Sequence, residues 1–321
     1  MSSMQKNIKQ LVILGLAVIL SLCLYLTINT RGNFEFAFML RSRRILAFIL
    51  VGMTTTISTI VFQTMTQNTI LTPSIIGLDS LYVLLQTAIV FLFGMHHKVS
   101  TNIYLNFFLS IALMIGSSVI FYWLFFKKYP GRINLLLMMG LIAGTFFGSV
   151  TTFLQVMIDP NEFESVFSRT VASFTNINTS LLFVSVLTCM PILLFLFLQT
   201  SKLDVLHLGR SYSVGLGIAI DRYYLVLFIL ISILVAISTA LIGPVSFLGF
   251  IGANLAYRLL KNYRHVILFI GGSLISQVFI ILGQTLVEHV FKMQTTLGVI
   301  VQFVGGVYFL FILLKERNSQ S

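Results

Sequence analysis

The sequence predicts an all-α membrane protein with about ten transmembrane helices, and three observations support this class. First, 57% of its 321 residues are hydrophobic and only 9% are charged, whereas a soluble domain carries about 25% charged residues. Second, apolar runs that could cross the roughly 30 Å hydrocarbon core of a bilayer recur along the whole chain. Third, these runs do not alternate apolar and polar residues as membrane β-strands do, so we expect a helical bundle.

Ten apolar runs are the candidate spans, and the third and eighth are short for a full crossing. The first run follows Lys6 and Lys9 as a signal peptide would, but it lacks a small-x-small cleavage site, so we expect an uncleaved first helix. No linker divides the chain, which predicts a single transmembrane domain over 1–321. The runs lie near 9–28, 45–65, 81–94, 104–126, 134–157, 180–200, 223–242, 246–260, 266–286 and 297–314.

The basic residues predict the orientation of the chain, because cytoplasmic loops of membrane proteins are enriched in lysine and arginine. With ten spans and both termini inside, 13 of the 20 basic residues fall in cytoplasmic segments and 7 in outside segments. The net charge of +11 therefore arises at span ends and does not indicate nucleic-acid binding. Four of the outside cations cluster in the expected 31–44 loop, against the rule, and this cluster requires an explanation.

The longest outside loop, residues 158–179, contains the start signal of a helix. Asp159 can cap a first turn, Pro160 suits the first helical position, and Glu162 stands where a capping box places an acid. We therefore expect a short outside helix over about 160–172, after the fifth span.

The polar segment 63–79 is unusual because it contains no lysine or arginine, while Pro73 and Gly77 are natural places for a helix to break. Non-helical backbone at membrane depth survives only where it is buried in protein or lines a cavity. The segment is therefore either a buried element beside a translocation path or an ordinary short cytoplasmic turn. The sequence leaves both interpretations open.

Three glycines four residues apart lie on one face of the fifth span: Gly140, Gly144 and Gly148. A face of this kind lets a neighbouring backbone approach closely. The spacing favours plain helix packing over a pore-lining role, although both are compatible with it.

The sequence lacks the residues that ATP hydrolysis requires, and it offers only one candidate for those that ion-coupled transport requires. No Gly-x-x-x-x-Gly-Lys-Ser/Thr loop is present, so we do not expect this chain to bind and hydrolyse ATP. An ion-coupled carrier keeps a carboxylate inside the bundle, but the nine acids lie at span ends or in loops, with Asp79 the one candidate for a deeper position. Cys23 and Cys189 are expected to be small buried hydrophobic residues. We therefore expect the energy source on a partner protein, and no metal or catalytic site here.

Four stretches of the sequence resemble a known family. Residues 203–217 (LDVLHLGRSYSVGLG) and 241–260 (LIGPVSFLGFIGANLAYRLL) resemble the loop after span six and the eighth-span region of FecCD-type permeases of ABC importers. Residues 40–80 resemble the family's second-span segment, and 297–315 its last helix. The resemblance thus covers nearly the whole chain. The segments TPSIIGLDS and FVGGVYFLFILLK most resemble the branch of the family that handles catecholate or petrobactin-type siderophores.

The resemblance implies a type II ABC importer permease in the cell membrane of a bacterium. Such permeases have ten spans, contact lipid, pair as dimers and rest on two cytoplasmic ATPase subunits, which bind ATP and magnesium, so we expect no cofactor in this chain. An extracytoplasmic siderophore-binding protein delivers the cargo. The dimer partner is either a second copy of this chain or a similar permease.

The resemblance further implies that the loop between spans six and seven, about 203–220 here, folds into coupling helices that contact the ATPase. We expect its leucines to pack on the bundle of this chain. Arg210 stands where the family often has glutamate, which puts the ionic contact in doubt. The positions assigned to ATPase coupling are Leu206, Gly209, Arg210, Gly215, Leu216 and Gly217.

A docking site and a translocation path are also implied. In relatives, arginines before the second span meet acidic residues of the binding protein, and such pairs steer docking. Arg41 and Arg44 match these positions, and Arg43 is an extra. Glu288 stands where some relatives place a further arginine, so that contact is lost or reversed. The path is expected along the 160–172 helix, the last span and Gln63, Asn68, Pro73, Gly77, Gly140, Gly144, Phe147 and Gly148.

The expected function is therefore that of the permease subunit of an ATP-driven importer of iron(III)–siderophore complexes. Within the family, heme or a corrinoid is the alternative cargo. Outside it, the alternative is a secondary transporter of amphipathic solutes driven by an ion gradient, which would need a buried carboxylate such as Asp79. The sequence leaves open which chelate is carried.

Overall fold

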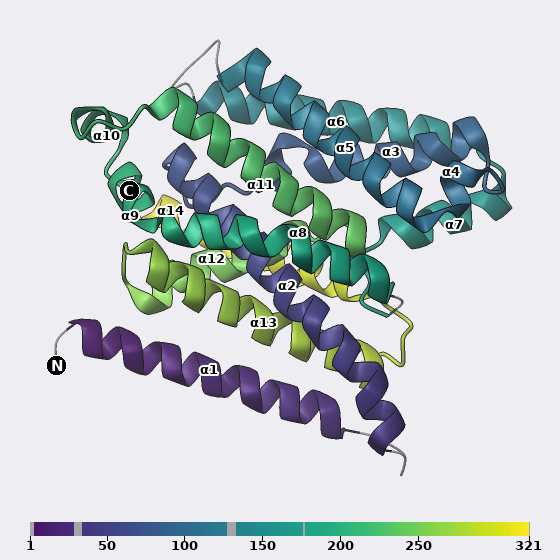
Figure 1. Ribbon diagram of the computed structural model, residues 1–321, viewed down its shortest axis with the longest axis horizontal. Helices are drawn as coiled ribbons and strands as arrows, with labels where there is room; N and C mark the ends of the chain where they lie inside the picture. Colours follow the sequence, from purple (N-terminus) through teal and green to yellow (C-terminus); the bar gives the residue numbers. More distant parts are fainter. Residues whose placement is uncertain (1–2, 29–33, 127–132, 176, 321) are drawn as a thin grey trace.

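The computed structural model describes residues 3–28, 34–126, 133–175 and 177–320. Within these ranges all regular secondary structure is helical (Figure 1), which confirms the predicted all-α class. The elements are α1 (Ser3–Thr27), α2 (Phe34–Thr66), the 3-10 turn η1 (Pro73–Ile76), α3 (Leu78–Phe93), α4 (Lys98–Thr101), α5 (Ile103–Phe121), the π-helical turn η2 (Tyr122–Phe126), α6 (Ile133–Met157), α7 (Pro160–Thr170), α8 (Thr179–Leu198), α9 (Thr200–His207), α10 (Arg210–Gly215), α11 (Ile220–Ile242), α12 (Ser246–Leu260), α13 (His265–His289) and α14 (Leu297–Gln320).

Eight of the described helices are long and apolar enough to cross a membrane: α1, α2, α5, α6, α8, α11, α13 and α14. The apolar helices α3 and α12 are shorter. They correspond to the third and eighth predicted runs, which are the short ones. These ten helices match the ten predicted spans in order, whereas the orientation of the chain across the membrane stays a prediction.

Helix α2 runs through the centre of the bundle (Figure 1), and 72% of its apolar window is buried. It packs against α13, α12 and α11. Gly252 of α12 faces the hydroxyls of Thr56 on α2 and Ser276 on α13, which lie 2.5 Å apart. Small residues of this kind allow close helix packing, which a membrane protein needs because lipid tails are as apolar as its own side chains.

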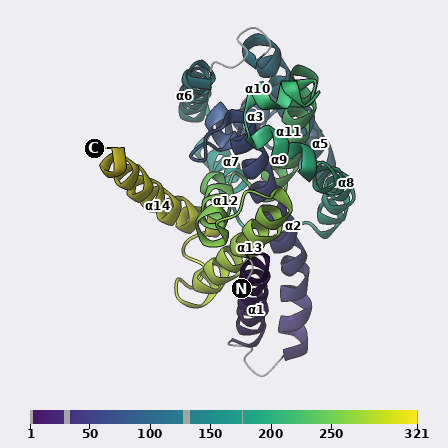
Figure 2. The ribbon, with the colours of Figure 1, turned by 90° about the vertical axis from the view of Figure 1, so that its left-hand side faces the viewer.

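Helices α6 and α14 are covered far less than α2, with 11% and 28% of their windows buried. Figure 2 shows α14 extending away from the rest of the bundle. Both helices expose large apolar side chains, including Phe146, Phe153, Phe303, Leu310 and Phe311. Lipid or another membrane protein can cover such surfaces.

The chain leaves helical geometry between α2 and α3. Pro73 occupies the first position of η1, and Gly77 ends this turn with a φ of +85°, which glycine adopts without steric cost. Pro73, Ile76 and Leu78 are buried. Residues 71–78 are therefore largely enclosed by protein, as the first of the two sequence interpretations requires.

The glycine face of α6 packs against this break. A side-chain carbon at Gly140 would lie 2.7 Å from the Ile75 carbonyl oxygen, and one at Gly77 would lie 3.0 Å from the backbone of Gly144. By contrast, a side-chain carbon at Gly148 would meet no atom within 4 Å. The predicted close packing is confirmed for Gly140 and Gly144 and does not extend to Gly148.

Predictions for the arginines before the second span and for one cysteine are wrong in detail. The arginines at 41, 43 and 44 do not lie in a loop, because α2 already begins at Phe34. Cys23 is exposed on α1, and Cys189 alone of the two is buried.

The helix predicted over about 160–172 is present as α7, and its start has one unexpected contact. The Asp159 carboxylate accepts a hydrogen bond from the Asn161 amide at 2.9 Å, as an N-cap does. Glu162 does not complete the capping box. Its carboxylate accepts instead from the Met95 amide at 3.1 Å, which fastens α7 to the end of α3.

Candidate coupling, docking and translocation sites

Two short helices, α9 and α10, form the predicted coupling segment. They meet at Gly209, whose φ of +101° lies in a region that other residues rarely adopt. Leu203 and Leu206 of α9 are fully buried against the bundle. In α10, by contrast, Tyr212 is 70% exposed and Val214 is also exposed. Grouped exposed apolar side chains mark interaction surfaces, so α10 has the character of a docking surface.

The other predicted coupling residues extend this surface. Gly215 ends α10, and Gly217 follows with a φ of +83°. Arg210 pairs with Asp221 at 3.0 Å, but both side chains are exposed, and such pairs contribute little stability. Leu216 is exposed. The expectation that the leucines pack on the bundle is therefore correct for α9 and wrong for Leu216.

Polar contacts that the sequence analysis missed fix α9 in place. Asp204 lies 2.6 Å from the His265 ring, and Gln67 donates to the carbonyl oxygen of Leu206 at 2.9 Å. Burial raises the pKa of Asp204, but the hydrogen bonds and charge of His265, with Arg264 nearby, outweigh it, so the pKa lies below its usual range. No local spacing could have paired Asp204 with His265, since they are 61 residues apart.

At the opposite end of the bundle, the predicted docking arginines have different surroundings. Arg41 is buried and donates to three carbonyl oxygens at the end of α1, at 2.8 to 3.1 Å. It thereby caps that helix end. Arg44 pairs with Glu288 at 2.6 Å, and these side chains are only 18% and 8% exposed. Arg43 is exposed. Docking stays a prediction for these three arginines and Glu288. Among the four, only Arg43 presents an exposed side chain.

Glu288 is the centre of a larger cluster. One of its oxygens accepts hydrogen bonds from Tyr25 at 3.1 Å, Gln284 at 2.9 Å and Arg44 at 2.6 Å. Arg44 also donates to the carbonyl oxygen of Thr175 at 3.2 Å. Tyr25, Arg44, Gln284 and Glu288, here called the outer cluster, join α1, α2 and α13 to the segment before α8.

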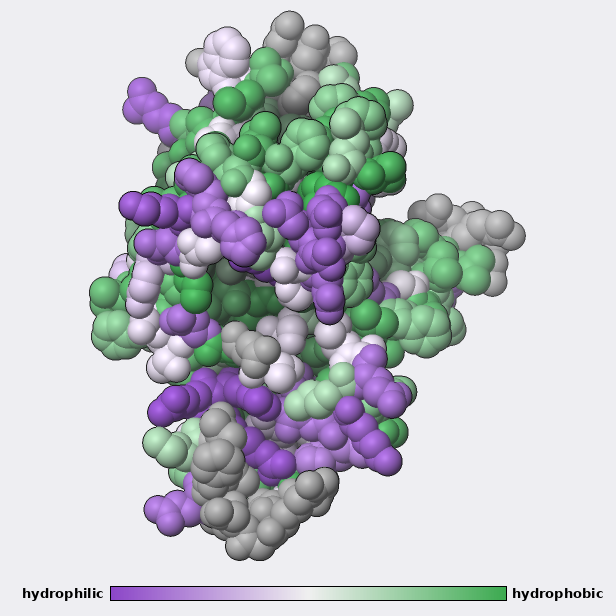
Figure 3. Space-filling view, turned by 90° about the vertical axis from the view of Figure 1, so that its right-hand side faces the viewer, coloured by the Kyte–Doolittle hydropathy of each residue, from purple (hydrophilic) through white to green (hydrophobic). Residues whose placement is uncertain are grey.

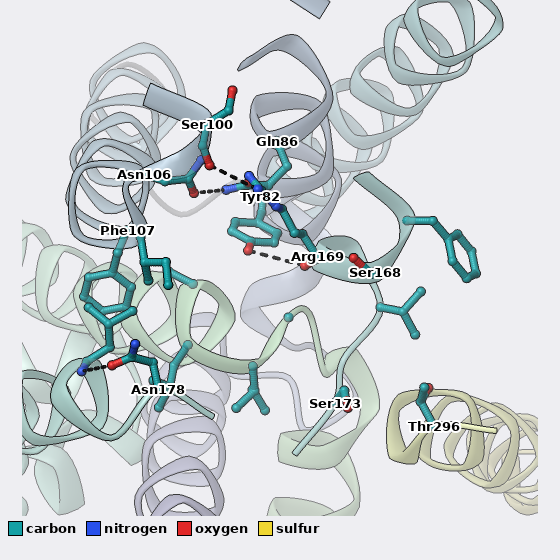
Figure 4. A pocket seen from close by; sticks show the side chains of 18 of the residues that line it. Tyr82, Gln86, Ser100, Asn106, Phe107, Ser168, Arg169, Ser173, Asn178 and Thr296 are labelled. Carbon is teal, nitrogen blue, oxygen red and sulfur yellow. Dashed lines mark hydrogen bonds between the residues drawn. The ribbon is translucent and has the colours of Figure 1, made fainter. Parts of the chain in front are cut away.

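A cavity of about 680 Å³ lies beside α7, between α3, α5, α8 and α11 (Figure 4). The buried Gln86 amide donates to Asn106 at 2.9 Å and Ser110 at 2.8 Å. Arg169 donates to the carbonyl oxygen of Ser100 at 3.0 Å, and burial lowers its pKa. Figure 3 shows this end of the molecule, where hydrophilic side chains flank a hollow. The cavity combines amide, guanidinium and aromatic groups, and can therefore hold a polar ligand.

The predicted path residues divide into two kinds. Gln63 donates to the Thr69 carbonyl oxygen at 2.6 Å, and Asn68 accepts from the Ile70 amide at 2.9 Å. These two amides therefore stabilise the turn after α2. Pro73, Gly77, Gly140 and Gly144 form the packed break described above, while Phe147 packs partly buried against the core and Gly148 lies apart. Their role in a path stays a prediction.

Asp79 is the one acid that the sequence analysis placed at possible depth. Its carboxylate accepts a hydrogen bond from the Ser246 hydroxyl at 2.6 Å. This contact joins the first turn of α3 to the first turn of α12. The geometry therefore gives Asp79 a structural role at the meeting point of the two short apolar helices.

Comparison with known proteins identifies the family. The model of the FecCD transport family matches residues 5–315. The chain belongs to the FecCD transport family. Two curated members agree along most or all of the chain. The petrobactin import system permease protein YclO of Bacillus subtilis is 43% identical over 98% of this chain and 100% of its own. The petrobactin import system permease protein FatC of Bacillus anthracis is 33% identical over 85% of this chain and 77% of its own.

A solved structure shows that the FecCD fold described here has a known counterpart. It is described as an inward-facing conformation of a metal-chelate type ABC transporter, and it matches with a TM-score of 0.81. It covers 96% of this chain and 99% of its own, at 22% identity. The predicted family and fold class are thus confirmed.

Proposed function

We propose that this chain is the membrane-spanning permease subunit of an ABC importer for iron(III)–siderophore complexes, and that its cargo is a petrobactin-type chelate. The observation that carries the proposal is the 43% identity to YclO over essentially the full length of both chains. The similarity to FatC supports the same cargo class. An intact iron–chelate complex already satisfies the metal, so the permease needs no iron ligands of its own.

The proposal includes the partners of the importer. The exposed apolar side chains of α10 support a contact with cytoplasmic ATPase subunits, which bind ATP and magnesium. Those of α6 and α14 support a contact with a second permease, either a copy of this chain or a similar one. The exposed Arg43 supports docking of an extracytoplasmic siderophore-binding protein. The importer resides in the cell membrane of a bacterium.

The ATPase contact can be tested by purifying the tagged chain from its native host and assaying ATP hydrolysis in the eluate. We expect an ATPase to co-purify with the wild type and to be lost from Tyr212→Glu, because a charge is placed on the apolar surface of α10. Tyr263→Glu is the matched control, since Tyr263 is 65% exposed, close to the 70% of Tyr212, but lies outside α9 and α10. An eluate without ATPase activity would overturn the importer assignment, and equal loss in both variants would overturn the assignment to α10.

The cargo class is tested separately by uptake into cells that lack other siderophore importers. Radiolabelled ferric petrobactin is expected to enter in a way that depends on this chain, and a ferric hydroxamate siderophore is not. Uptake of the hydroxamate alone would retain the importer and reject the petrobactin class.

A further inference from the structure

A continuous chain of polar contacts joins the coupling segment to α2 and α13, two of the most deeply buried helices. Asp204 of α9 lies 2.6 Å from Nδ1 of His265, the first residue of α13. The other ring nitrogen of His265 lies 2.8 Å from the Thr64 hydroxyl, near the end of α2. Asp204, His265 and Thr64, here called the inner cluster, thus connect α9, α13 and α2.

Asp204 also caps α13 from outside that helix. The residue before α13, Arg264, makes no side-chain capping hydrogen bond. The same oxygen of Asp204 that contacts the ring accepts from the His265 backbone amide at 2.8 Å. A carboxylate is favoured at a helix N-terminus, where backbone N–H groups are unpaired and the helix dipole is positive. Movement of α9 away from α13 would therefore break two hydrogen bonds to a charged group at once.

The surroundings make these bonds strong. His265 is fully buried, and the Asp204 side chain is 29% exposed. Ionised groups make the stronger hydrogen bonds, and a low-dielectric environment strengthens them further. An ionised carboxylate can only accept, so the proton between Asp204 and His265 belongs to Nδ1 of the ring.

A second contact ties α9 to the same end of α2. The Gln67 side-chain amide donates to the Leu206 carbonyl oxygen at 2.9 Å and to the Thr64 carbonyl oxygen at 2.8 Å. Leu203 and Leu206 of α9 are fully buried. Helix α9 is therefore held to the bundle by both polar contacts and packing.

Helix α10 is attached mainly through α9. The Ser213 hydroxyl lies 3.2 Å from the Val205 carbonyl oxygen of α9 and 2.8 Å from that of Gly209. The Arg210 contact with Asp221 on α11 is solvent-exposed and is therefore weak. A force applied to α10 reaches the buried part of the bundle first through α9.

We propose that the inner cluster transmits the movement of the coupling segment to α2 and α13, with Asp204 and His265 as positioning residues that couple ATP hydrolysis to transport. This inference rests on the proposed function. Without the inner cluster, α9 could move with the ATPase while α2 and α13 stayed behind. ATP would then be hydrolysed with little cargo moved.

The test measures cargo uptake and ATP hydrolysis together, in proteoliposomes that contain the permease, its ATPase and its binding protein, with ferric petrobactin as cargo. In Asp204→Ala we expect uptake per ATP to fall about tenfold, a size typical of coupling between sites, while ATP hydrolysis stays within about twofold of wild type. Asp204→Asn keeps an acceptor and should retain most of the coupling. Asn262→Ala is the matched control, because Asn262 accepts a hydrogen bond from the Arg264 amide at 2.8 Å just before α13 but lies outside the inner cluster and outside α9 and α10.

Two substitutions of His265 separate its two contacts. His265→Asn places an amide near the Nδ1 position and can keep the contact with Asp204, whereas His265→Gln reaches toward Thr64 and loses it. We expect the asparagine variant to retain more uptake per ATP than the glutamine variant. If His265 had only a structural role, both variants would form less folded complex, but uptake per ATP would be the same in the two.

A distance measurement supplies a readout that does not depend on transport. Spin labels at Lys202→Cys on α9 and Val266→Cys on α13, in a Cys23→Ser background, report the separation of the two helices. We expect this distance to be the same with and without ATP when Asp204 is present, and to change with ATP in Asp204→Ala. An unchanged distance and normal uptake per ATP in Asp204→Ala would overturn the proposal. Absence of ATP-driven uptake in the wild type would instead reject the proposed function.

Discussion

The two ends of the antiparallel α2–α13 pair are closed by different chemistry. At the end predicted to face outside, Arg44 of α2 and Glu288 of α13 form a largely buried ion pair at 2.6 Å. At the opposite end, predicted to face the cytoplasm, Thr64 of α2 and His265 of α13 meet at 2.8 Å, and Asp204 of α9 completes the cluster. Both clusters join the same two helices, but they differ in what else they hold.

This difference indicates different tasks. The outer cluster adds Tyr25 of α1 and the Thr175 carbonyl oxygen, which belong to the bundle itself. The inner cluster adds α9, which carries the exposed α10. The outer cluster therefore fixes the bundle internally, while the inner cluster connects it to the surface on which a partner is proposed to act. Stability and coupling should accordingly respond to substitutions at opposite ends.

The largest expected effect comes from breaking the outer cluster. Glu288→Leu leaves the Arg44 charge buried without its partner, which typically costs about 3–5 kcal/mol of stability. The double variant Arg44→Leu with Glu288→Leu should recover much of this loss, because no unpaired charge remains. Thermal unfolding in detergent measures both. Equal stability of the single variant and the wild type would contradict the assignment of a structural role to this pair.

The next prediction separates docking from structure at the outer end. Arg43 is exposed, unlike Arg41 and Arg44, so Arg43→Glu should leave the fold intact and lower the association rate of the binding protein about tenfold at low salt. Lys98→Glu, at another exposed cation of the same predicted side, is the control. Surface plasmon resonance at low and high salt tests the effect, which should shrink as salt screens the charges. A rate that is insensitive to Arg43→Glu would remove this residue from the docking site.

The smallest expected effect is a pH dependence of thermal stability that arises from Asp204 in the inner cluster. Because the pKa of Asp204 lies below its usual range in the folded chain, its contribution to stability is complete above the unfolded pKa of about 3.9. It is lost as the pH falls through the lower, folded value. Thermal unfolding followed from about pH 6 to pH 3 should therefore decline more steeply for the wild type than for Asp204→Asn. Parallel curves for the two proteins would show that ionisation of Asp204 does not stabilise the folded chain.

Much of the fold could be predicted from local sequence. Apolar runs located all ten apolar helices, Asp159 and Pro160 located the start of α7, and Pro73 with Gly77 located the break before α3. The spacing of Gly140 and Gly144 indicated close packing, which the structure confirms. Each of these signals lies within one segment, where composition and backbone preference act directly.

The candidate sites were less predictable, because their residues are assigned by what lies opposite them. Arg41, Arg43 and Arg44 look alike in sequence, yet one caps α1, one is exposed and one is paired across the bundle. Leu206 and Leu216 both match the coupling segment, yet only Leu206 is buried. Burial on a short helix depends on the neighbouring helices, and the sequence of that helix does not specify them.

The sequence by itself determined the class of protein, the number of apolar helices and their order, because partition into a bilayer depends on the composition of each run. The tertiary structure alone decided which polar groups meet. Arg44 and Glu288 are separated by 244 residues and Asp204 and His265 by 61, so no local pattern pairs them. A charge inside a membrane bundle is stable only with a partner, and the packing of α2 against α13 and α9 supplies that partner at each end.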